Sequence, residues 1–172
     1  GHDLIVTSGG ASLGEEDHVV KTLRAKGALS LWQLAIKPGR PMGVGLLDNT
    51  PVLALPGNPV AVFVCGLLYV WPFIAALAGA QWPEPRRLTL PAAFSIPKRK
   101  PGRREFFRGW LERDGDEGQL AVHKYPRDGS GLISSLRAAD GLIDVPEDRA
   151  SIEPGEPVFF IPFSEFGIFP RL

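Results

Sequence analysis

The stretch SGGASLGEED at residues 8–17 has a spacing of small residues that ordinary packing does not require. It follows a short apolar run at 3–7, which we expect to be a buried strand, and it precedes a helix predicted at 18–26. Its glycines allow successive N–H groups to converge on an anion at the start of that helix. A tight strand-to-helix turn would use the same residues, and the spacing fits neither the Walker loop nor the dinucleotide fingerprint.

The loop offers hydroxyl and amide donors and one carboxylate, which we take as candidate site residues: Ser8, Gly9, Gly10, Ser12, Gly14 and Asp17. Asp17 has two interpretations. It can cap the following helix. It can also face the anion and hold Mg²⁺, which usually takes one or two carboxylates together with ligand phosphates. The residues alone leave both interpretations open.

Two further stretches also follow strand-like runs, KPGRP at 37–41 and LPGNP at 55–59. At the end of a strand predicted at 29–36, Lys37 and Arg40 would attract phosphate or molybdate, although two solvated charges in a turn are the commoner case. The second stretch fixes the approach to a long helix predicted at 58–78, and its candidate site residues are Pro56, Gly57, Asn58 and Pro59. Asn58 is the expected helix cap, so a second helix N-terminus would point at the same ligand.

The order of elements predicts two domains joined by a linker. Residues 1–80, with a hairpin of strands at 42–47 and 52–55, read as an α/β domain. A stiff linker at 81–87 contains Trp-Pro-Glu-Pro. Residues 88–172 carry short strand-like runs and one short helix, which predict a small all-β, barrel-like domain. The expected strands are 88–94, 105–111, 120–125, 142–145 and 158–161, and the helix is 131–138.

Composition excludes several classes of function. Lys plus Arg equals Asp plus Glu at 19 each, so we expect no nucleic-acid partner. The single cysteine, Cys65, rules out an intrachain disulfide and is expected to be inert core. The apolar segment 60–80 is long enough to span a bilayer, but Pro72 interrupts it and its flanks lack Lys and Arg clusters. We therefore expect a buried helix, no membrane and a cytoplasmic protein.

The three motifs together resemble the molybdopterin molybdenumtransferase family, which includes bacterial MoeA and the E domain of gephyrin. The resemblance continues in GRREFFRG at 102–109, GSG at 129–131 and ADG at 139–141, which are similar to the family's C-terminal β domain. It implies the later part of a three-layer αβα molybdopterin-binding domain, followed by the β domain.

The resemblance also implies an activity. Family members insert molybdate into adenylylated molybdopterin and release AMP, with Mg²⁺ assisting, and they act as homodimers. Carried over by position, Asp17 and Lys37 match catalytic residues, Asp17 matches the metal ligand, and Ser130 matches a substrate-binding serine of the β domain. The other substrate-binding positions are those of the loop and of the LPGNP stretch.

Two departures from the family pattern limit these expectations. Gln33 stands where relatives carry a basic residue, on what we expect to be the same strand as Lys37, which would weaken anion attraction. The family's earlier domains and a Thr-Gly-Asp-Glu motif are absent, so we expect a fragment that is inactive alone. The alternatives are a non-catalytic scaffold of the gephyrin type and a molybdopterin adenylyltransferase. The basic cluster at 99–104 is expected to be a solvated edge of the β domain.

Overall fold

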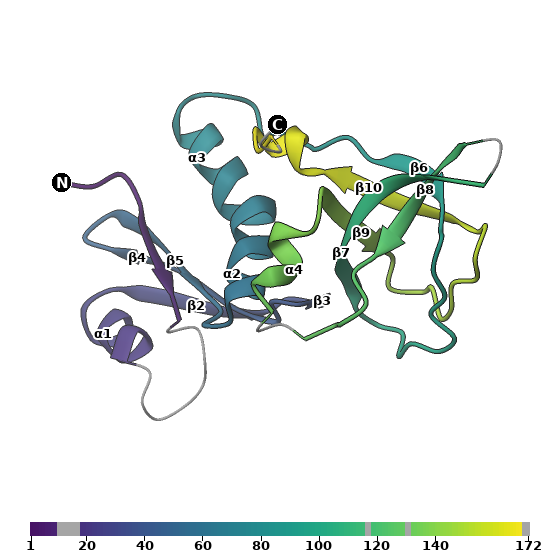
Figure 1. Cartoon of the computed structure of the whole chain (residues 1–172). Coiled ribbons are helices and arrows are strands. Elements are labelled where there is room, and N and C mark those ends of the chain that lie inside the picture. Colours follow the sequence, from purple (N-terminus) through teal and green to yellow (C-terminus); the bar gives the residue numbers. More distant parts are fainter. Residues whose placement is uncertain (10–17, 116–117, 130–131, 170–172) are drawn as a thin grey trace. The chain divides into compact units, whose positions relative to one another are not determined.

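The computed structural model describes residues 1–9, 18–115, 118–129 and 132–169. These residues form two compact units, Gly1–Pro83 and Glu84–Leu172 (Figure 1). The first unit combines helices with a mixed sheet, and the second is rich in strands. Each unit is described by itself below.

The first unit is built on a sheet with the strand order β1-β5-β4-β2 (Figure 1). Strand β1 (Ile5–Ser8) runs parallel to β5 (Thr50–Leu55). Strand β4 (Pro41–Leu47) is antiparallel to both β5 and β2 (Ala28–Gln33). Helix α1 (His18–Lys26) contacts β2 and β4 and buries Val20 and Leu23. A mixed α/β domain is therefore confirmed.

The hairpin between β4 and β5 forms as the sequence predicts. Leu47 pairs with Thr50, and the two residues between them make the turn. Asp48 and Asn49 have φ values of 47° and 64°. Both values lie in the left-handed region that two-residue hairpin turns require, and Asp and Asn tolerate that region better than most residues.

The single strand predicted at 29–36 is wrong. Strand β2 ends at Gln33, and a separate two-residue strand, β3, covers Ile36–Lys37. Between them the Leu34 N–H donates to the Arg40 carbonyl at 2.8 Å, which draws the chain away from the β2 ladder. Gln33 and Lys37 therefore lie on different strands, contrary to our expectation.

The long helix predicted at 58–78 is present and has a wider turn in its middle. It comprises α2 (Pro59–Cys65), a π-helical turn (Gly66–Val70) and α3 (Trp71–Leu77). Pro72 has no N–H to continue the regular ladder, and the Trp71 N–H reaches back five residues to Gly66. The helix begins against β5 and therefore starts beside the sheet.

By length and composition, the span Pro59–Leu77 could cross a membrane, with a mean hydropathy of 2.3 over its most apolar window. One such helix in the described residues is weak evidence, because a core helix passes the same test. A third of that window is buried inside the structure. The exposed side of α3 carries Ile74 and Leu77, each about half exposed.

In the second unit the sheet order is β8-β7-β9-β10-β6, with antiparallel pairing throughout. The strands are β6 (Leu88–Pro91), β7 (Arg104–Asp114), β8 (Gln119–Lys124), β9 (Gly141–Val145) and β10 (Pro157–Pro162). The short helix α4 (Ser134–Arg137) lies within the range predicted for it. Every strand predicted in this unit is present, with ends shifted by a few residues.

The barrel-like closure predicted for this unit needs correction. One isolated bridge joins Ala92 to Val122, supported by the Ala93 N–H donating to the Val122 carbonyl at 2.8 Å. In the described residues no ladder of several residues continues from that bridge, so the unit is β-rich and not a closed barrel.

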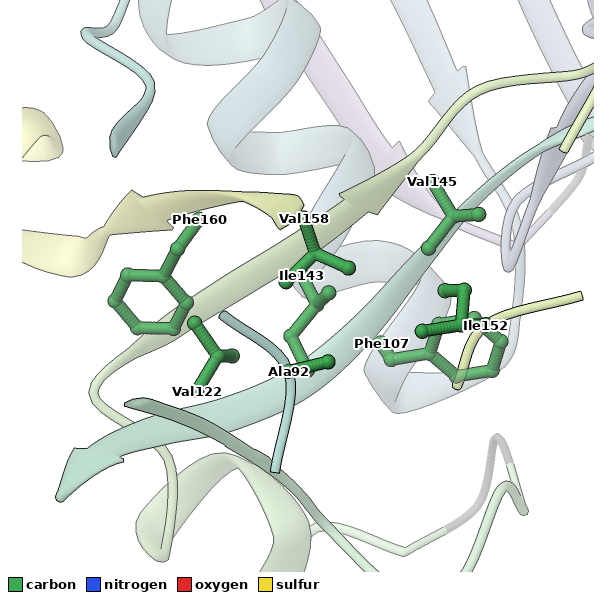
Figure 2. Packing of buried hydrophobic residues seen from close by; sticks show 8 residues of the cluster. All are labelled: Ala92, Phe107, Val122, Ile143, Val145, Ile152, Val158 and Phe160. Carbon is green, nitrogen blue, oxygen red and sulfur yellow. The ribbon is translucent and has the colours of Figure 1, made fainter. Parts of the chain in front are cut away.

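The core of the second unit is a cluster of apolar side chains contributed by neighbouring strands (Figure 2). Along β9, Ile143 and Val145 point into this cluster, and Asp144 between them points to the opposite face because side chains alternate along a strand. The cluster comprises Ala92, Phe107, Val122, Ile143, Val145, Ile152, Val158 and Phe160.

Candidate functional site

The candidate site begins where the parallel strands β1 and β5 end side by side. Ser8 pairs with Leu55, the last residue of each strand. The Gly9 N–H then donates to the Leu55 carbonyl at 2.9 Å. Carboxyl ends of neighbouring parallel strands form the edge at which ligands bind open α/β sheets. The structure therefore brings Ser8 and Gly9 together with the LPGNP turn.

Two glycines let the chain segments after these strands pass close to each other. A Cβ placed on Gly9 would lie 3.9 Å from the Gly57 Cα, and a Cβ on Gly57 would lie 3.8 Å from the Gly9 Cα. Gly9 has a φ of +93°, a conformation that other residues rarely adopt. The Thr7 hydroxyl donates to the Gly9 carbonyl at 2.9 Å and fixes the orientation of that peptide.

The LPGNP turn starts the long helix in the manner predicted. The Asn58 side-chain oxygen accepts from the Val60 N–H at 3.1 Å and the Ala61 N–H at 3.4 Å, so Asn58 is confirmed as the N-cap. Pro59 occupies the first turn, where its missing N–H costs nothing. Because the cap engages two of the free amides, the helix would act on an anion through its dipole and not through these N–H groups.

The KPGRP turn lies against the side of the same helix. Lys37 ends β3 and is exposed, and the Lys37–Pro38 peptide bond is cis. Gly39, with a φ of +110°, approaches so closely that a Cβ there would lie 2.5 Å from the Cys65 Sγ. Asn58 and Cys65 are seven residues apart, so the cap and this turn are separated by about 10 Å along the helix.

Cys65 is buried, as expected, and its burial raises the pKa of the thiol to about 12. The thiol contacts the Gly39 carbonyl at 3.9 Å. A thiol with so high a pKa stays protonated at neutral pH and is a poor nucleophile. Cys65 therefore supports the KPGRP turn by packing, in agreement with its prediction as inert core.

Gln33 has a partner that sequence reasoning did not identify. Its side-chain oxygen accepts from an Arg40 terminal nitrogen at 2.8 Å. The neutral amide therefore orients the neighbouring guanidinium. The expectation that Gln33 weakens anion attraction rested on the missing charge at position 33. It did not include the orientation of Arg40 by the Gln33 side chain.

Several predicted site residues lie outside the described part of the chain: Gly10, Ser12, Gly14, Asp17 and Ser130. The catalytic and metal-binding roles of Asp17 therefore stay predictions, as does the role of Ser130. Among the described residues, no group of three or more His, Cys, Asp or Glu side chains could hold a metal ion.

The chain leading to residue 130 is held by a buried arginine that sequence reasoning left without a role. Arg108 on β7 is 3% exposed, and burial lowers the pKa of its guanidinium. Its Nε donates to the Ser135 hydroxyl at 3.0 Å, and a terminal nitrogen donates to the carbonyls of Arg127 and Gly129 at 3.3 and 3.4 Å. The position of Arg108 within the GRREFFRG motif is the sequence feature that could have pointed to this role.

The interpretation of the basic cluster at 99–104 as a solvated edge is wrong for two of its members. Arg99 is buried, donates to the carbonyls of Pro146, Arg149 and Arg103, and pairs with Glu105 at 3.4 Å. Arg104 pairs with the fully buried carboxylate of Asp144 at 2.6 Å. Both arginines therefore hold the second unit together. Their most distant partners, Pro146 and Arg149 for Arg99 and Asp144 for Arg104, lie 40 or more residues along the chain and could not be read from local sequence.

Comparison with known proteins agrees with this arrangement in both units. Residues 1–76 match the family described as "Probable molybdopterin binding domain", and residues 89–163 match "MoeA C-terminal region (domain IV)". The chain is 36% identical to a molybdopterin molybdenumtransferase of Haemophilus influenzae over 94% of its length. It is 31% identical to molybdopterin molybdenumtransferase 2 of Mycobacterium tuberculosis over 89% of its length.

Solved structures with the same fold come from two archaea. The crystal structure of a molybdopterin biosynthesis MoeA protein from Pyrococcus horikosii superposes with a TM-score of 0.72 at 27% identity, covering 94% of this chain and 37% of that one. A molybdenum cofactor biosynthesis protein from Pyrococcus furiosus gives a TM-score of 0.62 at 29% identity, covering 84% of this chain and 52% of that one.

A match to a probable molybdopterin binding domain, followed by a match to a MoeA C-terminal region, defines the class to which the mixed α/β unit and the β-rich unit belong. The chain belongs to the MoeA family, whose relatives from Haemophilus and Mycobacterium are named as molybdopterin molybdenumtransferases. It spans 40% of the Haemophilus relative and 38% of the Mycobacterium relative.

Proposed function

We propose that this chain is part of a molybdopterin molybdenumtransferase that inserts molybdate into adenylylated molybdopterin and releases AMP. The supporting observation is the edge formed by β1 and β5, where the Gly9 and Gly57 backbones pass side by side at the start of a helix. Loop amides and a helix dipole at such an edge favour an anion such as the substrate phosphates. The family match supplies the substrate class, and the relatives' names supply the reaction.

Each part of the site contributes a different interaction in this proposal. The loop after β1 binds a phosphate through its amides and through the hydroxyls of Ser8 and Ser12. Lys37, together with Arg40 held by Gln33, supplies positive charge for molybdate or phosphate oxygens. Ser130, on a segment of the second unit whose start Arg108 holds, is proposed by its family position to bind substrate through its hydroxyl. The first unit belongs, in this proposal, to a three-layer αβα domain.

Magnesium enters the proposal through Asp17. An ion on Asp17 would complete its coordination with substrate phosphate oxygens and water, as Mg²⁺ commonly does. Bound there, the ion would neutralise charge on the departing phosphate. Asp17 would need to keep its carboxylate free for the metal, which distinguishes this role from that of a helix cap.

The test is a chimera in which this chain replaces the matched segment of the Haemophilus relative, because the chain covers 40% of that protein. We expect the chimera to release AMP from adenylylated molybdopterin only when molybdate is present, and the chain alone to be inactive. Failure of a folded chimera to release AMP would contradict the proposal. Binding of the substrate without turnover would instead favour the scaffold alternative.

Within the chimera, Asp17→Asn tests the metal role. We expect turnover to fall by about 100-fold, the scale on which removing one electrostatic contact acts, with a higher Mg²⁺ requirement and an unchanged melting temperature. Asp148→Asn, which removes an exposed carboxylate of the second unit, is the matched control. Unchanged turnover together with a lower melting temperature would show that Asp17 is a helix cap.

The adenylyltransferase alternative is less well supported, because the chain matches the MoeA C-terminal region at residues 89–163 in addition to the molybdopterin-binding domain at residues 1–76.

We further propose that the longer protein is a homodimer, with the exposed apolar residues Ile74 and Leu77 near its interface, and that it acts in the cytoplasm. Sedimentation of the chimera with Leu77→Lys tests the interface, since the substitution should shift the protein towards monomer.

A further inference from the structure

The second unit contains a small pocket that the proposed insertion site does not use. It has a volume of about 170 Å³ and is lined both by residues that face away from the core cluster, such as Asp144 and Phe159, and by three members of that cluster, Val145, Ile152 and Val158. Asp144, Phe159 and Thr89 stand in register across the three strands. Because side chains alternate along a strand, they point away from the core, into which Ile143 and Phe160 point (Figure 2). All of its lining residues belong to the second unit.

The walls of the pocket are apolar and held in place. Pro146, Pro157 and the partly exposed ring of Phe159 line it. Arg149, at one side, donates to the carbonyls of Ser151 and Pro157 and pairs with Glu156 at 2.9 Å. These bonds hold the Arg149 side chain to several backbone positions. This wall of the pocket is therefore formed before any ligand binds, as is usual for ligand pockets.

A network of ion pairs borders the pocket through Asp144 and Arg149, which line it. The buried carboxylate of Asp144 accepts from Arg87 Nε at 3.0 Å and from Arg104 Nε at 2.6 Å, so two guanidinium groups share one carboxylate. Arg149 is balanced by Glu156. These three cations and two anions leave one surplus positive charge. Arg87 is the most accessible of them, with its side chain 46% exposed.

The size and charge of the pocket together define a ligand class. An apolar cavity of 150 Å³ holds a benzene ring. The pocket therefore has room for one aromatic ring or a short branched alkyl group, and for little more. A planar guanidinium matches a planar carboxylate in geometry. We propose that this pocket binds a small organic anion composed of a single ring and a carboxylate, with the ring against Phe159 and the carboxylate towards Arg87.

The proposal is tested with two probes of the same shape, 3-phenylpropionate and the neutral 3-phenylpropan-1-ol, by calorimetry and ligand-observed NMR on the purified chain. We expect the carboxylate to bind at least tenfold more tightly than the alcohol. Equal affinity for the two probes, or no binding of the carboxylate at millimolar concentration, would overturn the proposal.

Two variants locate the site, and a third controls for charge. Arg87→Gln should remove the preference for the carboxylate, whereas Arg86→Gln, an equal charge change on the neighbouring exposed residue, should keep it. Thr89→Phe should fill the pocket and abolish binding of both probes, with thermal melts confirming that each variant folds. Retained binding in Thr89→Phe, or an equal loss in the two arginine variants, would show that the probe binds elsewhere or responds to net charge.

Discussion

The two units of this chain position their loops in different ways. In the first unit, glycine backbones approach other groups closely, Gly9 against Gly57 and Gly39 against Cys65. In the second unit, arginines paired with buried carboxylates cross-link distant segments, as Arg104 and Asp144 do. The difference indicates that the first unit should be sensitive to added bulk, and that the second should be sensitive to the loss or neutralisation of charge.

The largest effect should come from Asp144→Ala in the second unit. The substitution leaves Arg87 and Arg104 without their shared carboxylate, and breaking a buried ion pair costs about 3–5 kcal/mol. Because the two arginine side chains are 46% and 30% exposed, we expect a value near the lower end, about 3 kcal/mol.

Urea unfolding of the second unit measures this cost. The matched control is Asp148→Ala, which removes an exposed carboxylate a few residues away. If both variants lose the same stability, the ion pairs of Asp144 contribute little. That result would contradict the claim that the second unit is sensitive to the loss of charge.

The next effect should come from Gly39→Ala in the first unit. A Cβ at this position meets the Cys65 Sγ at 2.5 Å and the Ile36 Cδ1 at 3.3 Å, and the φ of +110° adds backbone strain. Overpacking of a well-packed site costs about 1–3 kcal/mol, and left-handed strain adds about 1 kcal/mol. We therefore expect a total loss of about 2–4 kcal/mol on thermal or urea unfolding.

Two further variants separate the clash at Gly39 from the strain. Gly79→Ala carries a similar φ of +86° with nothing within 4 Å of the new Cβ, so it should show the strain alone. Adding Cys65→Ala to Gly39→Ala removes the sulfur and should recover part of the loss. Equal costs at Gly39 and Gly79 would mean that close approach to Cys65 does not matter.

Local features of the fold could be predicted from sequence, and contacts between distant segments could not. The Asp48-Asn49 turn and the Asn58 cap follow from nearby residues and are present. The break after Gln33 depends on a bond from Leu34 to Arg40, across a turn whose path the sequence does not reveal. The pairing of Arg104 depends on Asp144, 40 residues further on.

The same distinction between local features and distant contacts applies to the candidate site. The LPGNP turn and the glycine loop could be paired from sequence because both follow strands, and the parallel register of β1 with β5 brings their described parts together. The support of Lys37 by the Gly39–Cys65 contact could not be predicted, since it depends on the packing of a turn on the side of a helix. Arg108 was noted only as part of the GRREFFRG motif, because a charged residue within a strand does not show which loop it contacts.

A smaller effect is expected at the helix start. Asn58→Ala removes the acceptor for the Val60 and Ala61 amides, and the loss of such a cap costs about 1 kcal/mol. Asn58→Asp keeps an acceptor and adds a charge favourable to the helix dipole, so its stability should be at least that of the wild type. Urea unfolding distinguishes the two, and equal losses would contradict a capping role.

Asn58→Asp has a second use, because the added negative charge lies beside the proposed phosphate site. It should weaken binding of inorganic pyrophosphate, whereas Asn58→Ala should leave the affinity close to that of the wild type. Calorimetry on the purified chain measures both. A variant that is more stable and yet binds the anion less well would separate the structural and the functional role of this turn.

The smallest effect should be an acid-dependent one at Glu156 in the second unit. The Glu153 N–H donates to its carboxylate at 2.8 Å and the Arg149 guanidinium donates at 2.9 Å, and these two bonds lower the pKa of Glu156 below its ordinary value of 4.5. A carboxyl whose pKa is lower in the folded state contributes stability above its unfolded pKa. That contribution is lost as the pH falls through the folded value.

Glu156→Gln should therefore lower the melting temperature slightly at pH 7 and leave it close to that of the wild type in acid below the folded pKa. The exposure of Glu156 keeps the difference small, because solvent screens such pairs. Melts from pH 7 down to pH 3 measure it, with Glu147→Gln, an exposed carboxylate nearby, as the control. If the melting temperatures of Glu156→Gln and the wild type differ by the same amount in acid as at pH 7, the effect comes from packing and not from the charge of Glu156. In that case this part of the second unit would depend on packing, as the first unit does.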